Sequence, residues 1–592
     1  MAPAKSFLVV HPCCLCGKEG RKIPRSMRTF TTVLAPAAFC CCAEAFILTS
    51  PRHFSRSEQS VSSLQAGPSS ASAAGTERTD ALVIGAGLSG SSLAFNLMKN
   101  GVSDVTVIEA NDRVGGNVIS MKKDGFQWEE GPNTFQPNNE IVKLAADLGM
   151  ADELRFADGG LPRWVFWDNV MHKLPGGPQD IPNFNLLSIP GKIRAALGAI
   201  GFVGPIPEKE ETIREFVCRH LGIEVFEKLI DPFVSGVYAG DPSKLSIEAC
   251  LPKIKRLESL GGPGLFDGGL LRMQELKKER AQSAADPNMP MVPKAALGSF
   301  KNGLRALCEA IAEKLGDRVK LSTRLVNLKP ITDPALLAEG YRLRASLLSL
   351  NGGGEREVLA KSVAITTPAY RTADLVESMV PAAAALRTIE YPPVASVIMA
   401  YPSSSVAASQ QPLSGFGHLI PRKNKIRTLG TIWVSSLFPE RAPEGWTVLS
   451  SYIGGAQDVK IATLNPEQIA AEVDRDMRTT LLKVDAPKPK ILGVRLWERA
   501  IPQYKLGHLE MLRRLEEDVS KVDGLFLGGN WKTGVAIGNC VAWGGEAASE
   551  ICAFLDSLSS PSSSGSAARE AAGEMGGEET KRKEEEVVAV GA

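Results

Sequence analysis

Three short apolar runs along the chain predict buried strands. They are Ala81–Ile84, Val105–Ile108 and Leu525–Leu527, and each has the length and composition of a strand covered on both faces in a parallel sheet. After the first run, apolar residues recur at helical spacing from Leu93 to Met98. After the last run, a second helix is predicted from about Val535 to Phe554. The pattern therefore predicts an α/β domain built from both ends of the chain.

The two ends themselves have compositions unsuited to a folded core. In residues 1–78, a basic stretch precedes a short apolar run and a small-residue site at Ala43-Glu44-Ala45, and a Ser-rich, acid-poor segment follows. This order is typical of organellar targeting. It resembles the bipartite leaders of algae with complex plastids, so we predict a plastid location, with a single mitochondrial or plastid presequence as the alternative. Residues 557–592 have few large apolar residues and are predicted to form a disordered tail.

The remaining composition narrows the classes of function. The 592 residues carry a formal net charge of +1, which provides no global field for nucleic acid. None of the six histidines pairs at ligand spacing, so no metal is expected. Six of the eleven cysteines lie in the leader and the others are scattered, which argues for reduced thiols. No run of 18 apolar residues occurs between 79 and 556, so no transmembrane helix is predicted.

A glycine motif directly follows the first predicted strand. It reads Gly85-Ala86-Gly87-Leu88-Ser89-Gly90, and Glu109 stands 19 residues beyond its last glycine, at the end of the second predicted strand. This is the context of a dinucleotide site. The glycines permit a tight turn, a close approach to a pyrophosphate and close packing of helix on strand, while free N–H groups of the helix face the phosphates. Glu109 can accept hydrogen bonds from the ribose hydroxyls and disfavours a 2′-phosphate, which argues against NADP.

Further glycines and one arginine favour FAD over NAD. Arg113 and Gly115-Gly116 follow Glu109 closely, and Gly131-Pro132 lies in a further extended segment. Arg113 can reach the phosphates, and the glycines let other loops cross a long, extended flavin dinucleotide. N–H groups at the start of the helix near Val535 can face the flavin pyrimidine, where negative charge grows on reduction. The two ends of the chain together predict a discontinuous FAD domain.

Several motifs together resemble a known family. "EANDRVGGN", "EEGPNTF" and "GLFLGGN" are similar to segments of the amine-oxidase-like flavoproteins, and "FVSGVYAGDPSKLS", "TLGTIWVSSLFPERAP" and "LGVRLWERAIPQY" narrow the resemblance to the plastid-type protoporphyrinogen oxidases. The resemblance covers about residues 80–555. It implies non-covalent FAD, oxidation of protoporphyrinogen IX by molecular oxygen with release of hydrogen peroxide, a place in heme and chlorophyll biosynthesis, and peripheral membrane association.

Other functions stay open at this point. A coproporphyrinogen III oxidase of the same family, another amine-oxidase-like flavoprotein and a flavin-binding protein without turnover are the alternatives, and the chain could form a homodimer. No catalytic acid or base is assigned, because the chemistry belongs to the flavin.

The resemblance also implies three structural units made from discontinuous segments. These are an α/β flavin domain with a Rossmann-like parallel sheet, a substrate domain with an antiparallel sheet, and a helical membrane-associating domain. The flavin domain is expected at 79–160, 271–330 and 496–556, the substrate domain at 161–178 and 331–495, and the helical domain at 179–270. Apolar residues beside Lys192 and Arg194 predict an amphipathic interfacial helix in the last of these, with a buried helix as the alternative.

Residue by residue, the resemblance assigns two sets of positions. The expected flavin-binding positions are Gly85, Ala86, Gly87, Leu88, Ser89, Gly90, Glu109, Arg113, Gly116, Gly131, Pro132, Asn133, Thr134, Val319, Val535, Ala536 and Ile537. The expected substrate-binding positions are Arg163, Tyr238, Ala239, Val397, Phe416 and Trp433. Arg163 is expected to bind a propionate carboxylate through its guanidinium fork, and the aromatic and apolar positions suit a macrocycle.

Two positions depart from the family pattern. Trp433 stands where Phe or Tyr is expected, which predicts a tighter pocket with stacking retained. Lys532 stands where plastid members carry a small apolar residue. We expect Lys532 to point to solvent, with assistance to oxygen reactivity at the reduced flavin as the alternative. Residues 328–357 are predicted to form a hairpin with a variable loop and no chemistry.

Overall fold

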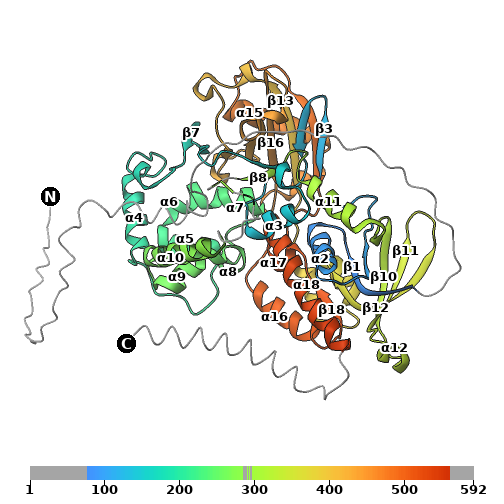
Figure 1. Cartoon of the computed structure of the whole chain (residues 1–592). Helices are drawn as coiled ribbons and strands as arrows, with labels where there is room; N and C mark the ends of the chain where they lie inside the picture. Colours follow the sequence, from blue (N-terminus) through green and yellow to red (C-terminus); the bar gives the residue numbers. More distant parts are fainter. Residues whose placement is uncertain (1–76, 284–289, 291, 294–296, 560–592) are drawn as a thin grey trace, which may run out of the picture.

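The computed structural model describes residues 77–283, 290, 292–293 and 297–559 (Figure 1). The predicted leader and tail lie outside the described residues except at their inner ends. There, strand β1 begins at Glu77 and helix α18 ends at Ser559, so both predicted boundaries move outward by two or three residues.

A seven-stranded sheet forms the core of the first unit. Its strands are β1 (Glu77–Ile84), β2 (Val105–Ile108), β9 (Val319–Lys320), β10 (Thr323–Pro330), β11 (Leu343–Ser349), β12 (Glu355–Ile365) and β18 (Leu525–Leu527). The order is β10-β11-β12-β1-β2-β9, with β18 paired to β12. Strand β1 runs parallel to β2 and β12, and β18 runs parallel to β12. The predicted apolar runs are therefore confirmed as neighbours in one parallel region, although they come from opposite ends of the chain.

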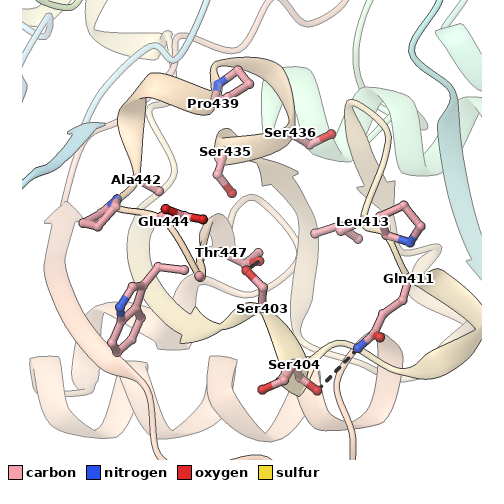
Figure 2. A pocket seen from close by; sticks show the side chains of 14 residues that line it. Ser403, Ser404, Gln411, Leu413, Ser435, Ser436, Pro439, Ala442, Glu444 and Thr447 are labelled. Carbon is pink, nitrogen blue, oxygen red and sulfur yellow. Dashed lines mark hydrogen bonds between the residues drawn. The ribbon is translucent and has the colours of Figure 1, made fainter.

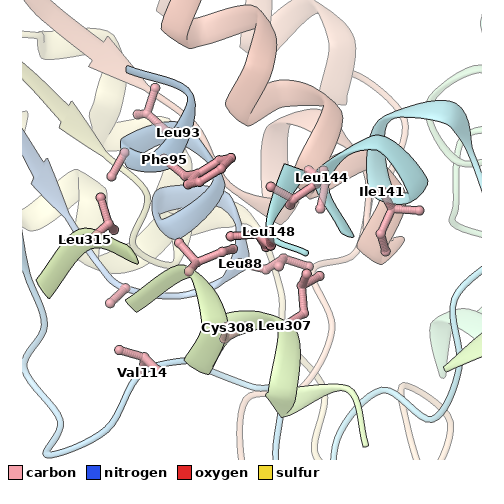
Figure 3. Close-up of a cluster of buried hydrophobic side chains, with 14 of the residues drawn as sticks. Leu88, Leu93, Phe95, Val114, Ile141, Leu144, Leu148, Leu307, Cys308 and Leu315 are labelled. Atoms are coloured by element: carbon pink, nitrogen blue, oxygen red, sulfur yellow. The ribbon is translucent and has the colours of Figure 1, made fainter. Parts of the chain in front are cut away.

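Helices cover both faces of this sheet, which explains its continuous apolar strands. One face packs on α2 (Leu88–Lys99), α3 (Asn139–Asp147), α11 (Arg305–Leu315) and α18 (Ile537–Ser559), whose buried side chains form the cluster in Figure 3. The other face packs on α13 (Ala369–Val376) and α16 (His508–Val519). Neighbouring residues of β1 divide between these layers, because Val83 belongs to the first cluster and Leu82 to the second.

A second seven-stranded sheet lies beside the first unit. Its strands are β6 (Arg163–Trp167), β7 (Val170–Lys173), β13 (Val394–Pro402), β14 (Gly417–Leu419), β15 (Thr428–Trp433), β16 (Trp446–Gly454) and β17 (Lys490–Trp497). All pairs are antiparallel except β6 with β14. Helix α15 (Pro466–Thr480) covers one face. The other face packs on Phe126 and Trp128 of β4 (Phe126–Glu129), which pairs with β3 (Ser120–Lys123).

The third unit is helical and has its own core. It contains α4 (Ile189–Ala199), α5 (Ile213–Leu221), α6 (Ile223–Val225), α7 (Asp231–Tyr238), α8 (Ile247–Cys250), α9 (Pro252–Gly261) and α10 (Leu265–Ser283). A capping box starts α5, because the Thr212 hydroxyl accepts from the Glu215 N–H and the Glu215 carboxylate accepts from the Thr212 N–H. Within the described part of the chain, no helix is long and apolar enough to cross a membrane.

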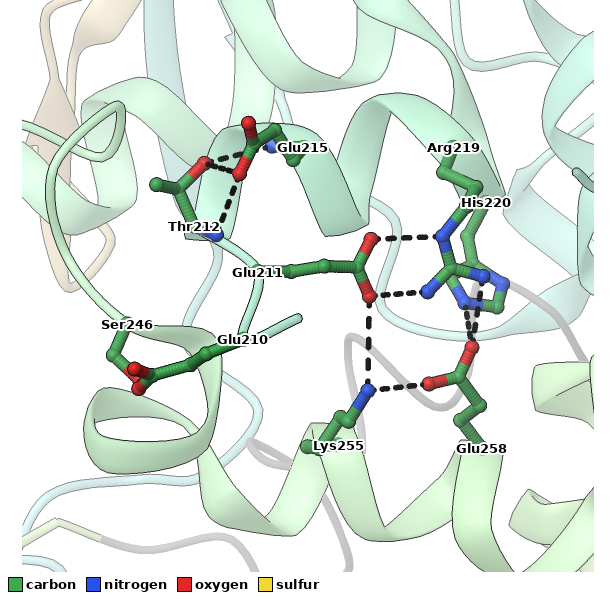
Figure 4. Close-up of polar contacts among 9 residues, drawn as sticks. All are labelled: Glu210, Glu211, Thr212, Glu215, Arg219, His220, Ser246, Lys255 and Glu258. Atoms are coloured by element: carbon green, nitrogen blue, oxygen red, sulfur yellow. Dashed lines mark hydrogen bonds and ion pairs between the residues drawn. The ribbon is translucent and has the colours of Figure 1, made fainter. Parts of the chain in front are cut away.

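A buried ionic network ties α5 to α9 (Figure 4). Arg219 forms ion pairs with Glu211 at 2.5 Å and with Glu258 at 2.8 Å, and Lys255 contacts Glu258 at 2.7 Å. His220, fully buried, lies 3.0 Å from the Glu258 carboxylate. Burial, which disfavours the charged imidazolium, lowers the pKa of His220. The network thus balances two carboxylates against two permanent cations inside the helical unit.

Two expected domain boundaries are corrected by the strand pairing. Residues 331–495 do not all belong to the substrate domain, because β11 and β12 pair with β10 and β1 in the first sheet. The second sheet resumes only at β13, and its last strand runs to Trp497. The helical domain does not end at 270, because α10 continues to Ser283. The hairpin expected at 328–357 is confirmed, since β10, β11 and β12 are successive antiparallel neighbours.

Candidate functional site

The glycine motif forms the turn between β1 and α2. Gly85 has a φ of +103°, which favours glycine. A Cβ at Gly90 would lie 2.0 Å from the Gly85 carbonyl oxygen, so only glycine allows this close packing. A Cβ at Gly87 would meet no protein atom within 4 Å. Because no side chain caps the N-terminus of α2, its first N–H groups remain available to an anion next to Gly87.

Glu109 lies at the end of β2, beside this turn. Its carboxylate accepts hydrogen bonds from the Ala86 N–H at 2.9 Å and the Asn111 N–H at 2.8 Å. Its own N–H bonds to the carbonyl of Lys320, which brings Val319 of β9 to the same sheet edge. A carboxylate has about four acceptor sites, so these contacts fix Glu109 in place and leave capacity for a further donor.

The loop after Glu109 crosses directly over the glycine motif. The Gly115 N–H donates to the Ala86 carbonyl, and a Cβ at Gly116 would lie 3.3 Å from Gly87 Cα. The Arg113 guanidinium donates to the carbonyls of Val114 and Gly116, so it braces this loop. Burial, together with the charges of two further arginines, lowers the pKa of Arg113. The two further arginines are ion-paired, Arg305 with Glu309 and Arg495 with Glu130, so Arg113 is the guanidinium of this loop best placed to attract an anion.

The start of α18 lies against the same motif. The thiol of Cys540, in the first turn of α18, lies beside the Ser89 hydroxyl, and the Ser92 hydroxyl donates to the carbonyl of Val541 at 3.2 Å. The expected positions Val535, Ala536 and Ile537 are therefore brought to α2, although the helix begins at Ile537, two residues later than predicted.

A row of buried polar atoms marks the face of the second sheet that is turned away from α15. Residues paired across neighbouring strands project from the same face of a sheet. By this criterion one face carries Arg163, Ser396, Ile398, Ile432, Ser450 and Tyr452. The hydroxyls of Ser396 and Ser450 are buried without a well-formed hydrogen bond to any described residue, and that of Ser450 lies close to the Tyr452 hydroxyl.

The segment that contains Gly131, Pro132, Asn133 and Thr134 approaches this face. Asn133 is 6% exposed, and its amide lies close to the Tyr452 hydroxyl without a well-formed hydrogen bond to any described residue. A Cβ at Gly131 would lie 1.9 Å from the Asn117 carbonyl oxygen, so the segment is pressed against the preceding loop. Buried polar groups are normally satisfied; the unpaired amide and hydroxyls therefore fit a polar group bound between the first unit and the second sheet.

Arg163 and Phe416 lie together at this face. The guanidinium carbon is 5.6 Å from the centre of the Phe416 ring, a distance typical of a cation–π contact. Burial lowers the pKa of Arg163, although a guanidinium stays charged at any working pH. The pair offers a cation and an aromatic surface side by side.

Val397 and Trp433 do not lie with Arg163, which corrects the sequence expectation. Both are fully buried in the core between the second sheet and α15. The indole N–H of Trp433 donates to Nδ1 of His418 at 3.1 Å. Because successive residues of a strand point to opposite faces, Val397 lies opposite Ile398 and Ser396. These two residues support the sheet from behind rather than line the face that bears Arg163.

Tyr238 and Ala239 have separate surroundings although they are adjacent. The Tyr238 hydroxyl donates to the carbonyl of Cys250 at 2.6 Å, inside the helical core. Ala239, with a φ of +49°, packs in a small cluster with Val394 and Tyr452. Ala239 is therefore close to the face that carries Arg163, while the side chain of Tyr238 is turned away into the helical unit.

The comparisons with known proteins agree with this arrangement. Residues 88–552 match the family of flavin containing amine oxidoreductases. The chain belongs to this family. It is 42% identical over 485 residues to the chloroplastic protoporphyrinogen oxidase of Oryza sativa subsp. japonica, covering 80% of this chain and 88% of that protein. It is 41% identical to the chloroplastic protoporphyrinogen oxidase 1 of Arabidopsis thaliana, covering 81% and 89%.

A solved structure shows the same fold. The crystal structure of a protein from Exiguobacterium sp. 255-15 superposes with a TM-score of 0.63 at 22% identity, covering 82% of this chain and all of that one. The cofactor of this flavin-containing oxidoreductase is FAD. The open N-terminus of α2, the space beside Gly87 and the unpaired amide of Asn133 fit an extended dinucleotide.

Lys532 does not lie free in solvent as expected. It belongs to a short helix, α17 (Asn530–Thr533), and its ammonium donates to the carbonyl of Leu527 at 3.0 Å. It also forms an ion pair with Glu516 of α16 at 2.5 Å. Lys532 therefore joins the end of β18 to α16.

A hollow of about 700 Å³ opens elsewhere in the second unit (Figure 2). Serine and proline residues and Trp446 line it, among them Ser403, Ser435 and Pro439. None of the expected substrate positions lines this hollow. Ser396, Ser450 and Tyr452 were not assigned from the sequence; they share one face of the second sheet, and Tyr452 lies beside Asn133. The motif "YIGGA" begins at Tyr452 but does not show which face this residue occupies.

Proposed function

We propose that the chain oxidises protoporphyrinogen IX to protoporphyrin IX. Removal of six hydrogens reduces three O₂ to three H₂O₂, in three turnovers of the flavin. The placement of Arg163 beside Phe416, on the sheet face that also carries the unpaired hydroxyls, supports this assignment. Similarity to chloroplastic protoporphyrinogen oxidases along four-fifths of the chain supports it independently.

The residues of the face would bind and orient the tetrapyrrole. FAD, when bound, accepts the hydrogens of the substrate as electron pairs and passes them to oxygen. The Arg163 fork would hold a propionate carboxylate through two charge-assisted hydrogen bonds. Phe416 and Ile432 would contact the apolar macrocycle, and the amide of Asn133 would hold a polar group at the boundary between the two units.

Neither Tyr452, on this face, nor His418, behind it, is suited to act as a base near neutral pH. Burial raises the pKa of Tyr452 above its ordinary value, so its hydroxyl stays protonated and can only donate or accept hydrogen bonds. His418 lies on the other face, where burial lowers its pKa to about 3. We propose that protons released during oxidation pass to the substrate nitrogens or to water.

The decisive test is turnover by the full chain. Purified holoenzyme should show a flavin spectrum and, on addition of protoporphyrinogen IX, porphyrin fluorescence with matched oxygen uptake and peroxide release. Coproporphyrinogen III, which carries four propionates, is the competing substrate. A higher kcat/KM for coproporphyrinogen III would assign the alternative activity, and bound flavin without peroxide from either substrate would refute oxidase function.

Substitution of Arg163 tests the carboxylate contact. Arg163→Met should raise KM about 10- to 100-fold with a smaller effect on kcat, because a charge-assisted hydrogen bond contributes about 1.5–3 kcal/mol. The KM of Arg163→Lys should lie between those of the unchanged protein and Arg163→Met, because an ammonium keeps the charge but cannot form the fork. Arg371→Met, an equal change on the exposed part of α13, is the control. An unchanged KM in Arg163→Met would place the carboxylate elsewhere.

We also propose that the helical unit docks on a plastid membrane through α4. Ile189, Ile193 and Leu197 recur every fourth residue along one side of α4 and are 73%, 56% and 43% exposed. Phe202, just beyond the helix, is 70% exposed. Together with Ile200, Ile206 and Ile223 these residues are here called the α4 apolar face. Exposed apolar residues that recur along one side of a helix suit the interfacial region of a bilayer.

Vesicle sedimentation tests this docking. The variant with both Ile193→Asn and Leu197→Asn should bind neutral phosphatidylcholine vesicles at least tenfold more weakly than the unchanged chain, because burial of two large aliphatic side chains contributes several kcal/mol. Val484→Asn, at an 89% exposed valine outside the helical unit, is the matched control. Equal binding by all three proteins would refute docking through α4.

Fusion of residues 1–78 to a fluorescent protein tests the proposed plastid address.

A further inference from the structure

A second cavity, of about 720 Å³, opens in the helical unit next to the α4 apolar face. Its lining includes Arg194, Arg214, Ser243 and the thiol of Cys218. Ile223 both lines the cavity and belongs to the α4 apolar face, where it is 50% exposed. The cavity is therefore located where an apolar surface and two guanidinium groups meet.

Arg194 is fixed in this cavity by the backbone. Its guanidinium donates to the carbonyls of His220 at 3.0 Å and Arg219 at 2.7 Å, at the last turn of α5. Its aliphatic stem rests on Gly222, where a Cβ would lie 2.9 Å from Arg194 Cγ. A Cβ at Gly198 would lie 1.5 Å from the His220 carbonyl oxygen, so α4 and α5 touch through their backbones at this point. Because these contacts already fix the Arg194 side chain, binding of an anion beside it would cost no further side-chain entropy.

Arg214 is the second cation, and no described residue forms an ion pair with it. Its guanidinium carbon lies 5.6 Å from the centre of the Phe226 ring and beside the Cys218 thiol. One carboxylate, Glu215, also lines the cavity, but its Oε2 accepts from both the N–H and the hydroxyl of Thr212 in the capping box. A hydrogen-bonded carboxylate keeps its charge, so the lining carries two guanidinium groups against one carboxylate, and Arg214 is the exposed cation that forms no ion pair with a described residue.

We propose that this cavity binds the phosphate of an anionic lipid headgroup while the α4 apolar face enters the bilayer. The inference rests on the proposed membrane docking and adds a specificity to it. An arginine fork matches phosphate oxygens bidentately. Ile223, which lines the cavity and belongs to the α4 apolar face, would contact the acyl chains of the same lipid. Free inorganic phosphate shares the headgroup chemistry, so the experiment separates the two sources.

The test uses full-chain holoenzyme and vesicles of phosphatidylcholine, alone or with phosphatidylglycerol. The unchanged protein should bind the mixed vesicles more tightly, and Arg214→Gln should reduce that preference about fivefold, the effect of one basic residue at an anionic membrane surface. Arg214→Lys should lose most of the preference as well, because charge is retained but the fork is lost. Binding to pure phosphatidylcholine, the flavin spectrum and turnover should be unchanged in both variants, as in Arg371→Gln.

Each other outcome has a definite meaning. A full preference retained in Arg214→Lys would overturn the cavity and leave only diffuse surface charge. Stabilisation of the unchanged protein by inorganic phosphate that is lost in Arg214→Gln, with no difference between the two proteins on mixed vesicles, would overturn the lipid in favour of free phosphate. Failure of the unchanged protein to bind either vesicle would sink the proposed membrane docking itself, whereas binding without any preference sinks the headgroup site alone.

Discussion

Two glycines of the same motif are expected to respond differently to alanine. A Cβ at Gly90 would lie 2.0 Å from the Gly85 carbonyl oxygen and 2.8 Å from the Thr366 hydroxyl, so Gly90→Ala collides with the protein itself. A Cβ at Gly87 would meet nothing within 4 Å. Gly87 has a φ of −70°, which alanine adopts without strain. Gly87→Ala therefore changes only the space that the cofactor would occupy.

The magnitudes follow from these distances. To accept Gly90→Ala, the turn between β1 and α2 must open by more than an ångström against backbone, and overpacking of this kind costs about 1–3 kcal/mol or more. Gly87→Ala should leave the unfolding free energy of the apoprotein within about 0.5 kcal/mol of its original value. It should weaken FAD binding about 10- to 100-fold, because the loss of one hydrogen bond to a charged phosphate costs about 1.5–3 kcal/mol.

Two measurements on the full chain separate these effects. Titration of flavin-free protein with FAD, followed by quenching of flavin fluorescence, gives affinity, and urea denaturation without FAD gives stability. Gly545→Ala, at a helical position of α18 where a Cβ would also meet nothing within 4 Å, is the control; it should leave FAD affinity unchanged and raise stability by about 0.5–1 kcal/mol, the helix-propensity gain of alanine over glycine. The proposed cofactor geometry would be refuted if Gly87→Ala bound FAD like the control, or if Gly90→Ala were as stable as the control.

Three further predictions concern buried and paired charges. Glu258→Gln should lower the unfolding free energy, measured by urea denaturation, by about 3–5 kcal/mol, because it leaves an excess cation in the buried network. Adding Lys255→Met should recover part of this loss. Strictly additive effects of the two substitutions on the unfolding free energy would contradict this prediction. Burial raises the pKa of Glu129 to about 7 from an ordinary 4.5, so the folded state retains a proton and stability falls as pH rises through that window. Glu129→Gln should therefore gain stability relative to the unchanged protein between those pH values, by up to about 3 kcal/mol, and a pH-independent difference would contradict the raised pKa. Lys532→Ala, which frees Glu516, should leave the rate of flavin reoxidation by oxygen within twofold in stopped-flow experiments, and a tenfold loss would show a direct role.

The sequence predicted the first sheet well where its strands are parallel and covered on both faces. β2 and β18 have the predicted bounds, because burial on both sides leaves an uninterrupted apolar run. The membership of β11 and β12 was mispredicted. Their alternating pattern predicts a hairpin but does not show which sheet the hairpin joins. That sheet is set by contacts between distant residues: the Ser362 hydroxyl donates to the carbonyl of Asp80, 282 residues away in the chain.

The faces of the second sheet could not be assigned from the sequence for a related reason. Both sides of β13 are buried, so Val397 and Ile398 are both apolar although they point in opposite directions. Resemblance to a family predicts Val397 near a substrate, whereas the pairing of β13 with β16 puts Ile398 and not Val397 on the face of Arg163. The small residues on that face, Ser396 and Ser450, gave no signal because isolated serines occur throughout the chain.

The expected flavin positions come from distant parts of the sequence, so cofactor binding should depend on folding of the unit built from both chain ends more than on folding of the helical unit. Gly85–Gly90, Gly131–Thr134, Val319 and the start of α18 meet only when both ends of the chain have joined the first sheet. If FAD binds at these expected positions, it should bind only the assembled unit and stabilise it by mass action, by about 2.7 kcal/mol at a hundred times its dissociation constant. The helical unit, 189–283, is continuous, has its own core and supplies none of the expected flavin positions. Removal of FAD should accordingly destabilise the unit built from the two chain ends while the α4 apolar face and its neighbouring cavity stay formed.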